Sequence, residues 1–443
     1  MHITFHRVFI VAVAALAAMF LPGCGSEDNT PTPPDEPVPY HLEQRGNYTI
    51  AWLHGTPYEM GHQQGELLHD AIADAMVFVE NDEVLSLIPA IADGLGVIDL
   101  ALSNSFQDIL DECQGLVDAT ADVGFNMDYC LVLNFGDILM ERIPSFKAEG
   151  PGCTEVITRG VASGDDRIYH ARNLDWGSMD ISIIHRHPVI FVRQPADGLA
   201  HVIVGFPTNI SPYTGMNIAG ISMCSNEIDP VDETQKSDTG RSHVQMMYEM
   251  LKSVTSLEEV KTFLESQQHM SSELIVVADG NAKTGAVFEM TAAHMHANYL
   301  EDDYVYAVNH FLSAEMDPYD LEQDVDNPDS SLMRQWRLEQ LVDPDGEDTH
   351  YGSLDLNGLS TVMRDRVNPL TKVEPPYDEE NIDNDAGIGT NGPMHFVLFD
   401  PEKHLFWVAA GQLPIPQQPY VCFSMQELLG YRNAIACPAP QID

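Results

Sequence analysis

A cysteine stands at the point where the residue pattern of the chain changes, in the run Pro151-Gly152-Cys153-Thr154-Glu155. If the chain is cut between Gly152 and Cys153, the thiol gains a free α-amine on its own residue, with an unperturbed pKa near ~8, and so has its own general base. Gly152 suits such a cut because a residue without a Cβ tolerates a strained backbone and provides a small acyl group for an N-to-S shift. This context favours a nucleophile, although a buried cysteine is in general more often a small apolar side chain.

The run from Tyr169 to Trp176, Tyr-His-Ala-Arg-Asn-Leu-Asp-Trp, follows Cys153 through a predicted β-hairpin. With Cys153 it resembles the N-terminal-nucleophile (Ntn) hydrolases that cleave linear amides, a group that includes choloylglycine hydrolases and acid ceramidase-type amidases. The run from Gly55 to Gly65 resembles the opening of the propeptide of the acyl-coenzyme A:6-aminopenicillanic acid acyltransferase family, which is peptidase family C45. The resemblance to that family extends from about residue 48 to the end of the chain.

Six residues match the family's site in chain order: Cys153, Arg172, Asp175, Asn226, Asn309 and Arg334. The resemblance implies that Cys153 is the nucleophile and, after self-cleavage behind Gly152, the new N-terminus. Arg172 would place a fixed positive charge beside the thiol, lower its pKa and favour the thiolate. Asp175 would orient the α-amine by accepting a hydrogen bond from it.

The resemblance further implies that Asn226 donates a hydrogen bond to an oxyanion, that Asn309 is the family's second asparagine, at the end of a strand, and that Arg334 is a later arginine of the site. Each residue has another explanation when taken singly. An arginine and an aspartate three residues apart could form a surface ion pair, and an asparagine after a strand is usually a turn former. Their joint occurrence in the family's order favours the site.

No cofactor is implied, and we predict no metal site. His294 and His296 could share one strand face as metal ligands, but no third ligand at a suitable spacing is evident. The acidic run from Asp343 to Asp348 begins like a calcium loop, but its twelfth position is Leu354 rather than glutamate. A solvated acidic turn is the better interpretation of that run.

The elements that position these residues fall into two blocks. Helical spacing of apolar residues dominates from about Tyr48 to Gly152, whereas short β-type runs joined by turns follow Cys153. Two helical stretches interrupt the strands, one from about Ser242 to Glu265 with a capping signal at Ser256, the other from Ser331 to Val342. The pattern favours an α+β protein with antiparallel sheets layered with helices, and the resemblance implies a four-layer αββα sandwich, the Ntn hydrolase fold, with a mainly helical N-terminal prosegment.

Four segments are predicted along the chain. Residues 1–24 form a lipoprotein-type signal peptide ending at Cys24, the expected lipidation site, because the apolar run after Arg7 is too short for a stable membrane span. Residues 25–45 form a Pro-rich acidic linker, 46–152 a helical propeptide or α chain, and 153–443 the catalytic chain. The location implied is the cell envelope, either the bacterial outer membrane and periplasm or the cell surface, with membrane contact only through the anchor. Ordinary secretion is the alternative.

The 443 residues include 68 Asp and Glu against 21 Lys and Arg, a net charge of −47. This surface would repel phosphates, so nucleic acid is excluded as a partner. The charge is consistent with a salt-adapted host and equally with an acidic secreted protein. Of the seven cysteines, Cys113 with Cys130 and Cys422 with Cys437 are the locally plausible disulfide pairs, although sequence cannot determine connectivity. Cys153 and Cys224 are then the candidates for free thiols.

The function implied by the resemblance is that of a self-cleaving cysteine hydrolase acting on linear C–N amide bonds of small N-acylated substrates, through an acyl-thioester on Cys153. The two chains left by self-cleavage are expected to stay associated. One alternative is an acyltransferase that moves an acyl group between a thioester or amide and an amine. Another is a non-catalytic cell-envelope lipoprotein that binds a ligand and retains the fold.

Overall fold

The structure, a computed structural model, describes residues 30–83, 85–135, 152–175, 186–229, 231–376, 387–389 and 393–443. The predicted signal peptide, with Cys24, lies outside the described residues. A compact unit runs from Pro31 to Asp443, and the elements below belong to it.

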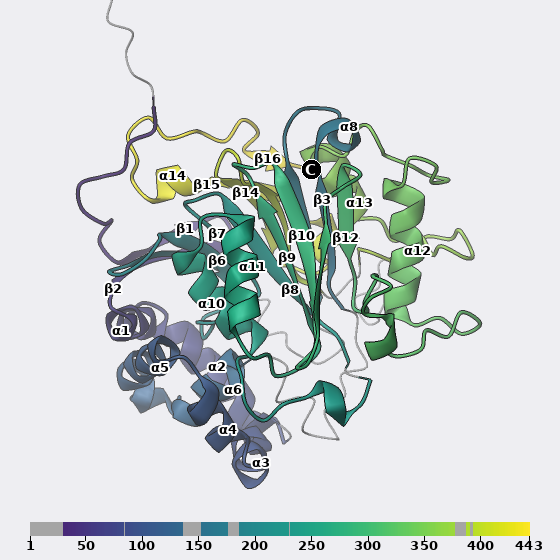
Figure 1. Ribbon diagram of the computed structural model, residues 1–443. Helices are drawn as coiled ribbons and strands as arrows, with labels where there is room; N and C mark the ends of the chain where they lie inside the picture. The colour runs from purple at the N-terminus through teal and green to yellow at the C-terminus, as the bar shows by residue number, and fades with distance from the viewer. Residues whose placement is uncertain are drawn as a thin grey trace, which may run out of the picture. The chain divides into compact units, whose positions relative to one another are not determined.

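Two sheets form the centre of this unit (Figure 1). In the nine-stranded sheet the spatial order is β1 (His41–Arg45), β2 (Tyr48–Gly55), β5 (Val189–Pro195), β6 (His201–Gly205), β7 (Thr214–Asn217), β8 (Ile221–Glu227), β9 (Glu273–Asp279), β10 (Thr284–Met290) and β11 (Met295–Tyr299). In the seven-stranded sheet it is β12 (Tyr304–Ala307), β3 (Thr154–Thr158), β4 (Tyr169–Asp175), β13 (Pro393–Asp400), β14 (Leu405–Ala410), β15 (Tyr420–Ser424) and β16 (Gln441–Ile442). Neighbouring described strands pair antiparallel, except that β2 lies parallel to β5.

Helices cover the outer faces of both sheets. The helices before Cys153 are α1 (Pro57–Leu67), α2 (His69–Asn81), α3 (Ile88–Gly94), α4 (Val97–Asn104), α5 (Gln107–Thr120) and α6 (Met127–Asn134). The later ones are α8 (Gly160–Ser163), α10 (His243–Ser253), α11 (Leu257–Ser266), α12 (Ser330–Val342), α13 (Leu356–Met363) and α14 (Met425–Leu428). Short 3₁₀ turns lie at Leu85–Leu87, Ala121–Val123, Glu233–Gln235, Asp317–Tyr319 and Ile415–Gln417.

Buried side chains show how the layers stack. One cluster joins α1, α2, α5, α10 and α11 to the outer face of the nine-stranded sheet, for example Met60 and Met247 with Phe288. Another joins α12 and α13 to the outer face of the seven-stranded sheet. Between the sheets, Val192 packs in one cluster with Phe406, and Val276 in another with Ile157. The predicted four-layer αββα sandwich is therefore confirmed.

The prosegment contributes strands as well as helices, which corrects the prediction of helical structure from Tyr48. β2 lies within the nine-stranded sheet, with Ile50 and Trp52 facing the other sheet and Ala51 and Leu53 facing the helices. A strand buried on both faces shows a continuous apolar run, which periodicity alone cannot distinguish from a buried helix. The helix begins after it, where Thr56 and Glu59 form a capping box and Pro57 takes the first helical position.

The segment predicted as a linker, 25–45, lies against the body in its described part. His41–Arg45 is the edge strand β1, Thr32 makes a bridge with Arg432, and the Val38 backbone N–H donates to Gln194 at 3.0 Å. Backbone groups of a polar run can complete a sheet edge without an apolar pattern of their own, so composition did not reveal these contacts.

Most other predicted elements match the structure. The stretch from Ser242 to Glu265 is two helices rather than one, and the break falls at Ser256, whose side chain caps α11 by accepting from the Glu259 N–H. The two disulfides are Cys113–Cys130 and Cys422–Cys437, while Cys153 and Cys224 are free and buried. The predicted pairs and free thiols are thus confirmed.

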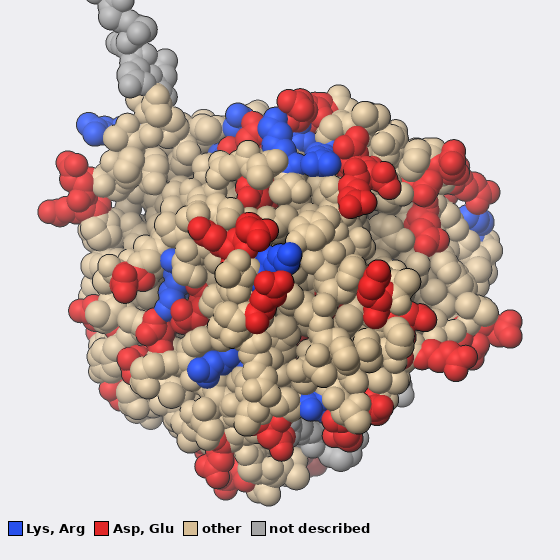
Figure 2. Space-filling view, in the orientation of Figure 1, with Lys and Arg blue, Asp and Glu red and all other residues tan. Residues whose placement is uncertain are grey.

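Acidic side chains are spread over the face seen in Figure 2, where Lys and Arg are fewer, as the net charge of −47 requires. In the described part of the chain, we found no single helix that is both long and apolar enough to cross a membrane. The helical segments Leu85–Gly94 and Val97–Asn104 meet that criterion only together, and they are bent by 75° relative to each other.

Candidate active site

The pairing of β3 with β4 places the start of β3 beside the end of β4. Thr154 lies opposite Asn173, and Glu155 lies opposite Arg172. Residues directly opposite one another share a face of the sheet, and side chains alternate along each strand. Arg172, Glu155 and, by continuation, Cys153 therefore point into the space between the two sheets, where Ile157 of the same face also packs.

Cys153 is buried, with 6% of its surface exposed, and packs with Leu174, Phe206, Tyr213 and other apolar side chains. Its sulfur lies 3.4 Å from Nη2 of Arg172. Its carbonyl oxygen accepts a hydrogen bond from Nη1 of Arg334. Two cations thus contact the same residue, one at the thiol and one at the main chain.

Arg172 spans the two sheets through its other nitrogen. Nη1 donates to Oε1 of Glu155, to the Ser225 carbonyl at 2.8 Å and to Oδ1 of Asn226 at 3.2 Å. Glu155 and Arg172 are fully buried. The partner carboxylate of Arg172 is therefore Glu155, two residues after the cysteine.

The two predicted site asparagines lie near the ends of β8 and β12. The Asn226 amide donates to the Val308 carbonyl at 2.9 Å, and the Asn309 amide donates to the Glu227 carbonyl at 2.8 Å. Oδ1 of Asn309 accepts from Nη2 of Arg334 at 2.8 Å. Because a primary amide has two N–H donors, each asparagine keeps a second donor beyond the one bonded to a carbonyl.

Gly152 lies directly against Asn309. A Cβ built on Gly152 would stand 1.7 Å from Oδ1 and 2.2 Å from Cγ of Asn309. The φ of Gly152 is outside the left-handed region, so the expected reason for this glycine, a strained backbone, is wrong. Close approach of the Asn309 side chain is what requires it.

Asp175 is buried at the end of β4 and lies close enough to Cys153 to raise the pKa of its thiol electrostatically. An odd spacing along a strand places Asp175 on the face opposite to that of Arg172. The alternative of a surface ion pair between these two residues is therefore contradicted, since both are buried and Arg172 pairs with Glu155. Hydrogen bonds connect five of the six predicted residues, Cys153, Arg172, Asn226, Asn309 and Arg334, whereas Asp175 acts on Cys153 through its charge.

Burial raises the pKa of the Cys153 thiol to about 12; Arg172 and Arg334 act to lower it, while Glu155 and Asp175 act to raise it. Arg172 lowers the pKa of the thiol, as predicted. The thiolate is nevertheless not favoured, because the loss of solvent around the sulfur raises the pKa by more than the charge of Arg172 lowers it. A thiol with such a pKa is protonated at neutral pH and needs a base to become a nucleophile.

Glu155 and His170 are site residues to which the sequence patterns assigned no role. Oε2 of Glu155 lies 3.5 Å from Nε2 of His170, and Nδ1 of His170 lies 3.0 Å from the Ser222 hydroxyl. Both side chains are fully buried. The sequence did contain a signal for Glu155: it is a charged residue within a short β-type run whose other residues suit burial. Burying a charge without a partner is costly, so such a residue indicates a buried partner.

Glu155, His170 and Cys224 each bring one potential metal ligand atom within 4.8 Å of the others. Three such ligands would suffice for a zinc site. However, Arg172 already occupies Oε1 of Glu155, and its positive charge opposes a second cation in a buried space. We therefore interpret the group as a cluster of buried polar side chains around the Glu155–Arg172 ion pair. Of the two histidines considered in the sequence as metal ligands, His294 stacks its ring on Tyr319, with ring centroids 3.8 Å apart.

Sequence comparison finds two matches. The profile of the acyl-coenzyme A:6-aminopenicillanic acid acyl-transferase family matches residues 161–372. This range contains five of the predicted site residues (Arg172, Asp175, Asn226, Asn309 and Arg334) but begins after Cys153 and is narrower than the resemblance drawn from the motifs. An uncharacterised protein of Archaeoglobus fulgidus is 24% identical over 313 residues, covering 61% of this chain and 51% of the relative. The chain thus spans about half the length of the curated relative that it matches.

Solved structures with similarity to the chain include three amide hydrolases. The N-acylethanolamine-hydrolyzing acid amidase ortholog of Caenorhabditis elegans has 16% identity and a TM-score of 0.37, covering 61% of this chain and 99% of its own. Penicillin V acylase from Agrobacterium tumefaciens has 12% identity and a TM-score of 0.34, covering 62% and 87%. A variant of the conjugated bile acid hydrolase of Clostridium perfringens has 11% identity and a TM-score of 0.35, covering 62% and 93%.

The αββα architecture rests on the two sheets and their helices, and the family resemblance rests on the motifs and the profile match. Over residues 161–372 the chain thus resembles the acyl-coenzyme A:6-aminopenicillanic acid acyl-transferase family, as its motifs predicted, and its two central sheets with their covering helices form an αββα sandwich.

Proposed function

We propose that this protein is a cysteine Ntn hydrolase that cuts its own chain before Cys153 and then hydrolyses the amide bond of small N-acylated substrates. The observation that carries the proposal is the set of contacts at Cys153: Arg172 at its sulfur, and Arg334 joining its carbonyl to Asn309, the residue packed against Gly152. Acyl transfer needs a nucleophile, a base and donors for the oxyanion, and this cluster supplies all three once the α-amine is free.

Self-cleavage begins with attack of the Cys153 sulfur on the Gly152 carbonyl carbon. The C–N bond breaks as the C–S bond forms, and the nitrogen takes up a proton to become the α-amine of Cys153. Water then hydrolyses the thioester, which leaves a carboxylate on Gly152 and restores the thiol. The lack of a side chain on Gly152 allows Asn309 to stand beside the reacting carbonyl.

Turnover uses the same atoms with a substrate amide in place of the Gly152–Cys153 bond. The α-amine accepts the thiol proton, the sulfur attacks the amide carbonyl, and in this proposal Asn226 and Asn309 donate their second N–H groups to the oxyanion. The α-ammonium returns the proton to the leaving amine. Water, deprotonated by the α-amine, resolves the acyl-thioester to a carboxylic acid and the free thiol.

An apolar cavity of about 150 Å³ supports an apolar acyl group in the substrate. Its lining includes Phe78 of α2, Ile88 of α3 and Tyr129 of α6, together with Phe206. Phe206 also packs in the cluster that contains Cys153. The prosegment helices therefore line this cavity together with Phe206, which also packs beside the proposed nucleophile.

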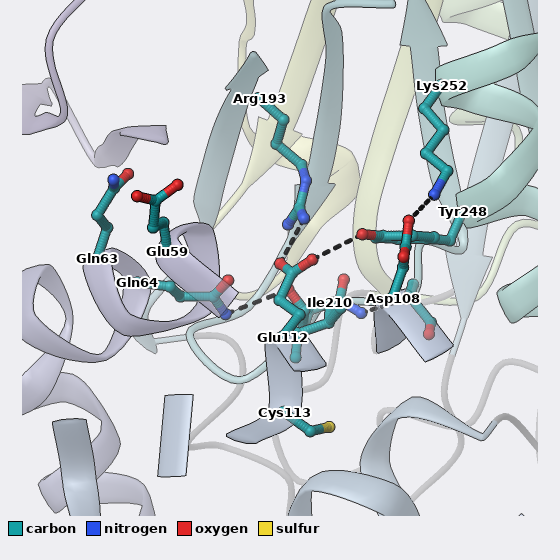
Figure 3. Close-up of polar contacts among 12 residues, drawn as sticks. Glu59, Gln63, Gln64, Asp108, Glu112, Cys113, Arg193, Ile210, Tyr248 and Lys252 are labelled. Carbon is teal, nitrogen blue, oxygen red and sulfur yellow. Dashed lines mark hydrogen bonds and ion pairs between the residues drawn. The ribbon is translucent and has the colours of Figure 1, made fainter. Parts of the chain in front are cut away.

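Retention of the prosegment after cleavage follows from its contacts with the catalytic chain. Glu112 of α5 points at Arg193 of β5 and Tyr248 of α10 (Figure 3). The Tyr248 hydroxyl donates to Oε2 of Glu112 at 2.9 Å, and Glu112 and Arg193 are fully buried. Separation of the chains would expose these charges and the paired edge of β2, so we propose that the two chains stay associated.

Export and a lipid anchor at Cys24 remain part of the proposal, on the composition of residues 1–24 alone. An acyltransferase, in which an amine rather than water resolves the thioester, is the second candidate, and the family profile that matches the chain favours it. Adding an amine such as hydroxylamine during turnover separates the two: a hydrolase releases chiefly the acid, whereas an acyltransferase releases chiefly the acylated amine.

The test of the proposed function is the state of the purified chain. We expect wild type to run as two bands on a denaturing gel, with the larger beginning at Cys153. Cys153→Ala should run as one band and release no amine from a panel of N-acyl amides. Cys224→Ala, which removes the other buried free thiol, is the matched control and should be cut. An uncut wild-type chain would overturn the proposal and leave the binding lipoprotein as the interpretation.

A further inference from the structure

We infer that Glu155 is a positioning residue of this site, which orients the Arg172 guanidinium toward Cys153 and offsets part of its positive charge. The inference rests on the proposed role of Cys153 as nucleophile. It adds a residue to which neither the motifs nor the family resemblance assigned a role.

The orientation follows from the contacts of Arg172. Its two terminal nitrogens contact different groups. Nη2 faces the Cys153 sulfur at 3.4 Å. Nη1 donates to Glu155, to the Ser225 carbonyl and to Asn226. Glu155 is the only anion among the acceptors of Nη1 in these contacts. Since hydrogen bonds to ionised groups are about twice as strong as neutral ones, Glu155 has the largest part in fixing the guanidinium plane.

Glu155 is itself held from the other side. Its second carboxylate oxygen faces Nε2 of His170 at 3.5 Å, and His170 meets Ser222 of β8 through its other ring nitrogen. The line from Ser222 through His170, Glu155 and Arg172 to Cys153 therefore crosses between the two sheets. Every member except Cys153 is fully buried, and Cys153 is 6% exposed.

The charge effect follows from the same geometry. In a buried space the interaction of charges is screened far less than in water. A carboxylate on the far side of the guanidinium opposes the attraction between Arg172 and a thiolate, so Cys153 remains a thiol until a base takes its proton. In turnover by the cleaved protein, that base is the α-amine of Cys153 itself.

The test is the rate of Cys153 alkylation by iodoacetamide from about pH 6 to about pH 10, read at the Cys153 peptide by mass spectrometry. Glu155→Gln keeps an oxygen that accepts from Arg172 but removes the negative charge. We expect the pH profile to shift down by about one unit, which is about a tenfold faster reaction at a given pH. The other ionisable groups that act on the pair or on Cys153 are His170, Asp175, Cys224 and Arg334, and all stay intact.

Glu112→Gln is the matched control, because Glu112 and Arg193 are also a fully buried ion pair (Figure 3), and neither is among the charged groups of the described chain that act on the Cys153 thiol. A merely structural role for Glu155 predicts that both variants lose thermal stability and that neither moves the alkylation profile. An unchanged or upward-shifted profile in folded Glu155→Gln would overturn the inference.

Glu155→Asp tests the orienting role and covers the case in which Glu155→Gln does not fold. The shorter side chain keeps the charge but cannot reach Arg172 in the same geometry, so we expect a profile within a few tenths of a pH unit of wild type and a kcat about tenfold lower. Full activity in Glu155→Asp would refute the orienting role. Alkylation needs no turnover, so an inactive or uncut wild type would count against the proposed function and leave this measurement valid.

Discussion

Gly152→Ala should slow self-cleavage, because a side chain at residue 152 would clash with Asn309. The new methyl group would lie 1.7 Å from Oδ1 and 2.6 Å from Nδ2 of Asn309. Real Cβ atoms do not approach other atoms so closely, so Asn309 or the peptide at residue 152 must move. Asn309 is held in place by Arg334 and by the Glu227 carbonyl, each at 2.8 Å.

The size of the effect can be worked from those contacts. Displacing the Asn309 side chain breaks two hydrogen bonds, one of them to a cation, and hydrogen bonds to charged groups contribute about 1.5–3 kcal/mol. Overpacking adds about 1–3 kcal/mol where the backbone must shift instead. If about 2–4 kcal/mol of this falls on the transition state for attack at Gly152, cleavage slows by about 30-fold to 1,000-fold.

The assay follows precursor loss on denaturing gels after synthesis of wild type and variants. Gly94→Ala in α3 is the control, because a Cβ there meets nothing within 4 Å. The double variant Gly152→Ala with Asn309→Ala removes the clash, so we expect it to be no slower than Asn309→Ala alone. Cleavage of Gly152→Ala within threefold of wild type would refute the reasoning, as would strictly additive losses in the double variant.

Three further predictions concern charge. Arg172→Leu removes a cation that lowers the pKa of the Cys153 thiol, so alkylation near pH 8 should slow by about tenfold; an unchanged rate would exclude that role. Glu112→Ala leaves Arg193 buried without its partner carboxylate, which should lower the free energy of unfolding by about 3–5 kcal/mol. The loss would be measured as a lower urea midpoint and as loss of the prosegment from the cleaved protein during gel filtration. Burial, aided by Arg193, lowers the pKa of His201 to about 3. Between about pH 6.5 and pH 3 the unfolded chain therefore binds more protons at this residue than the folded chain does. The contribution of His201 to stability is full above that window and falls as the pH drops through it. His201→Gln should flatten this fall in thermal melts, whereas His69→Gln should not, because the hydrogen bond with Asp122 raises the pKa of His69 instead of lowering it.

Much of the secondary structure of residues 153–443 could be predicted from short patterns. The runs around Ile157, Val204, Val276 and Trp407 lie in strands β3, β6, β9 and β14, as their β-branched and aromatic residues and flanking turns indicated. β2 could not be predicted in this way, because burial on both faces removes the alternation that marks a strand. Nor could its parallel pairing with β5, which depends on a contact between segments separated by most of the prosegment.

The amino-acid sequence by itself determined which groups are available for chemistry: a cysteine behind a glycine, an arginine and an aspartate one hairpin later, and two asparagines and an arginine farther along. Local residue types are enough for that, because the chemistry of a thiol, an amide or a guanidinium is a property of the side chain. The tertiary structure decided what those groups contact. Strand register placed Glu155 opposite Arg172, so that Glu155 is the counter-ion of Arg172. The close approach of Asn309, which follows β12, leaves no space for a side chain at residue 152. Burial between two sheets raised the pKa of the thiol. Register, close approach and desolvation are relations between distant segments, and no single stretch of sequence contains them.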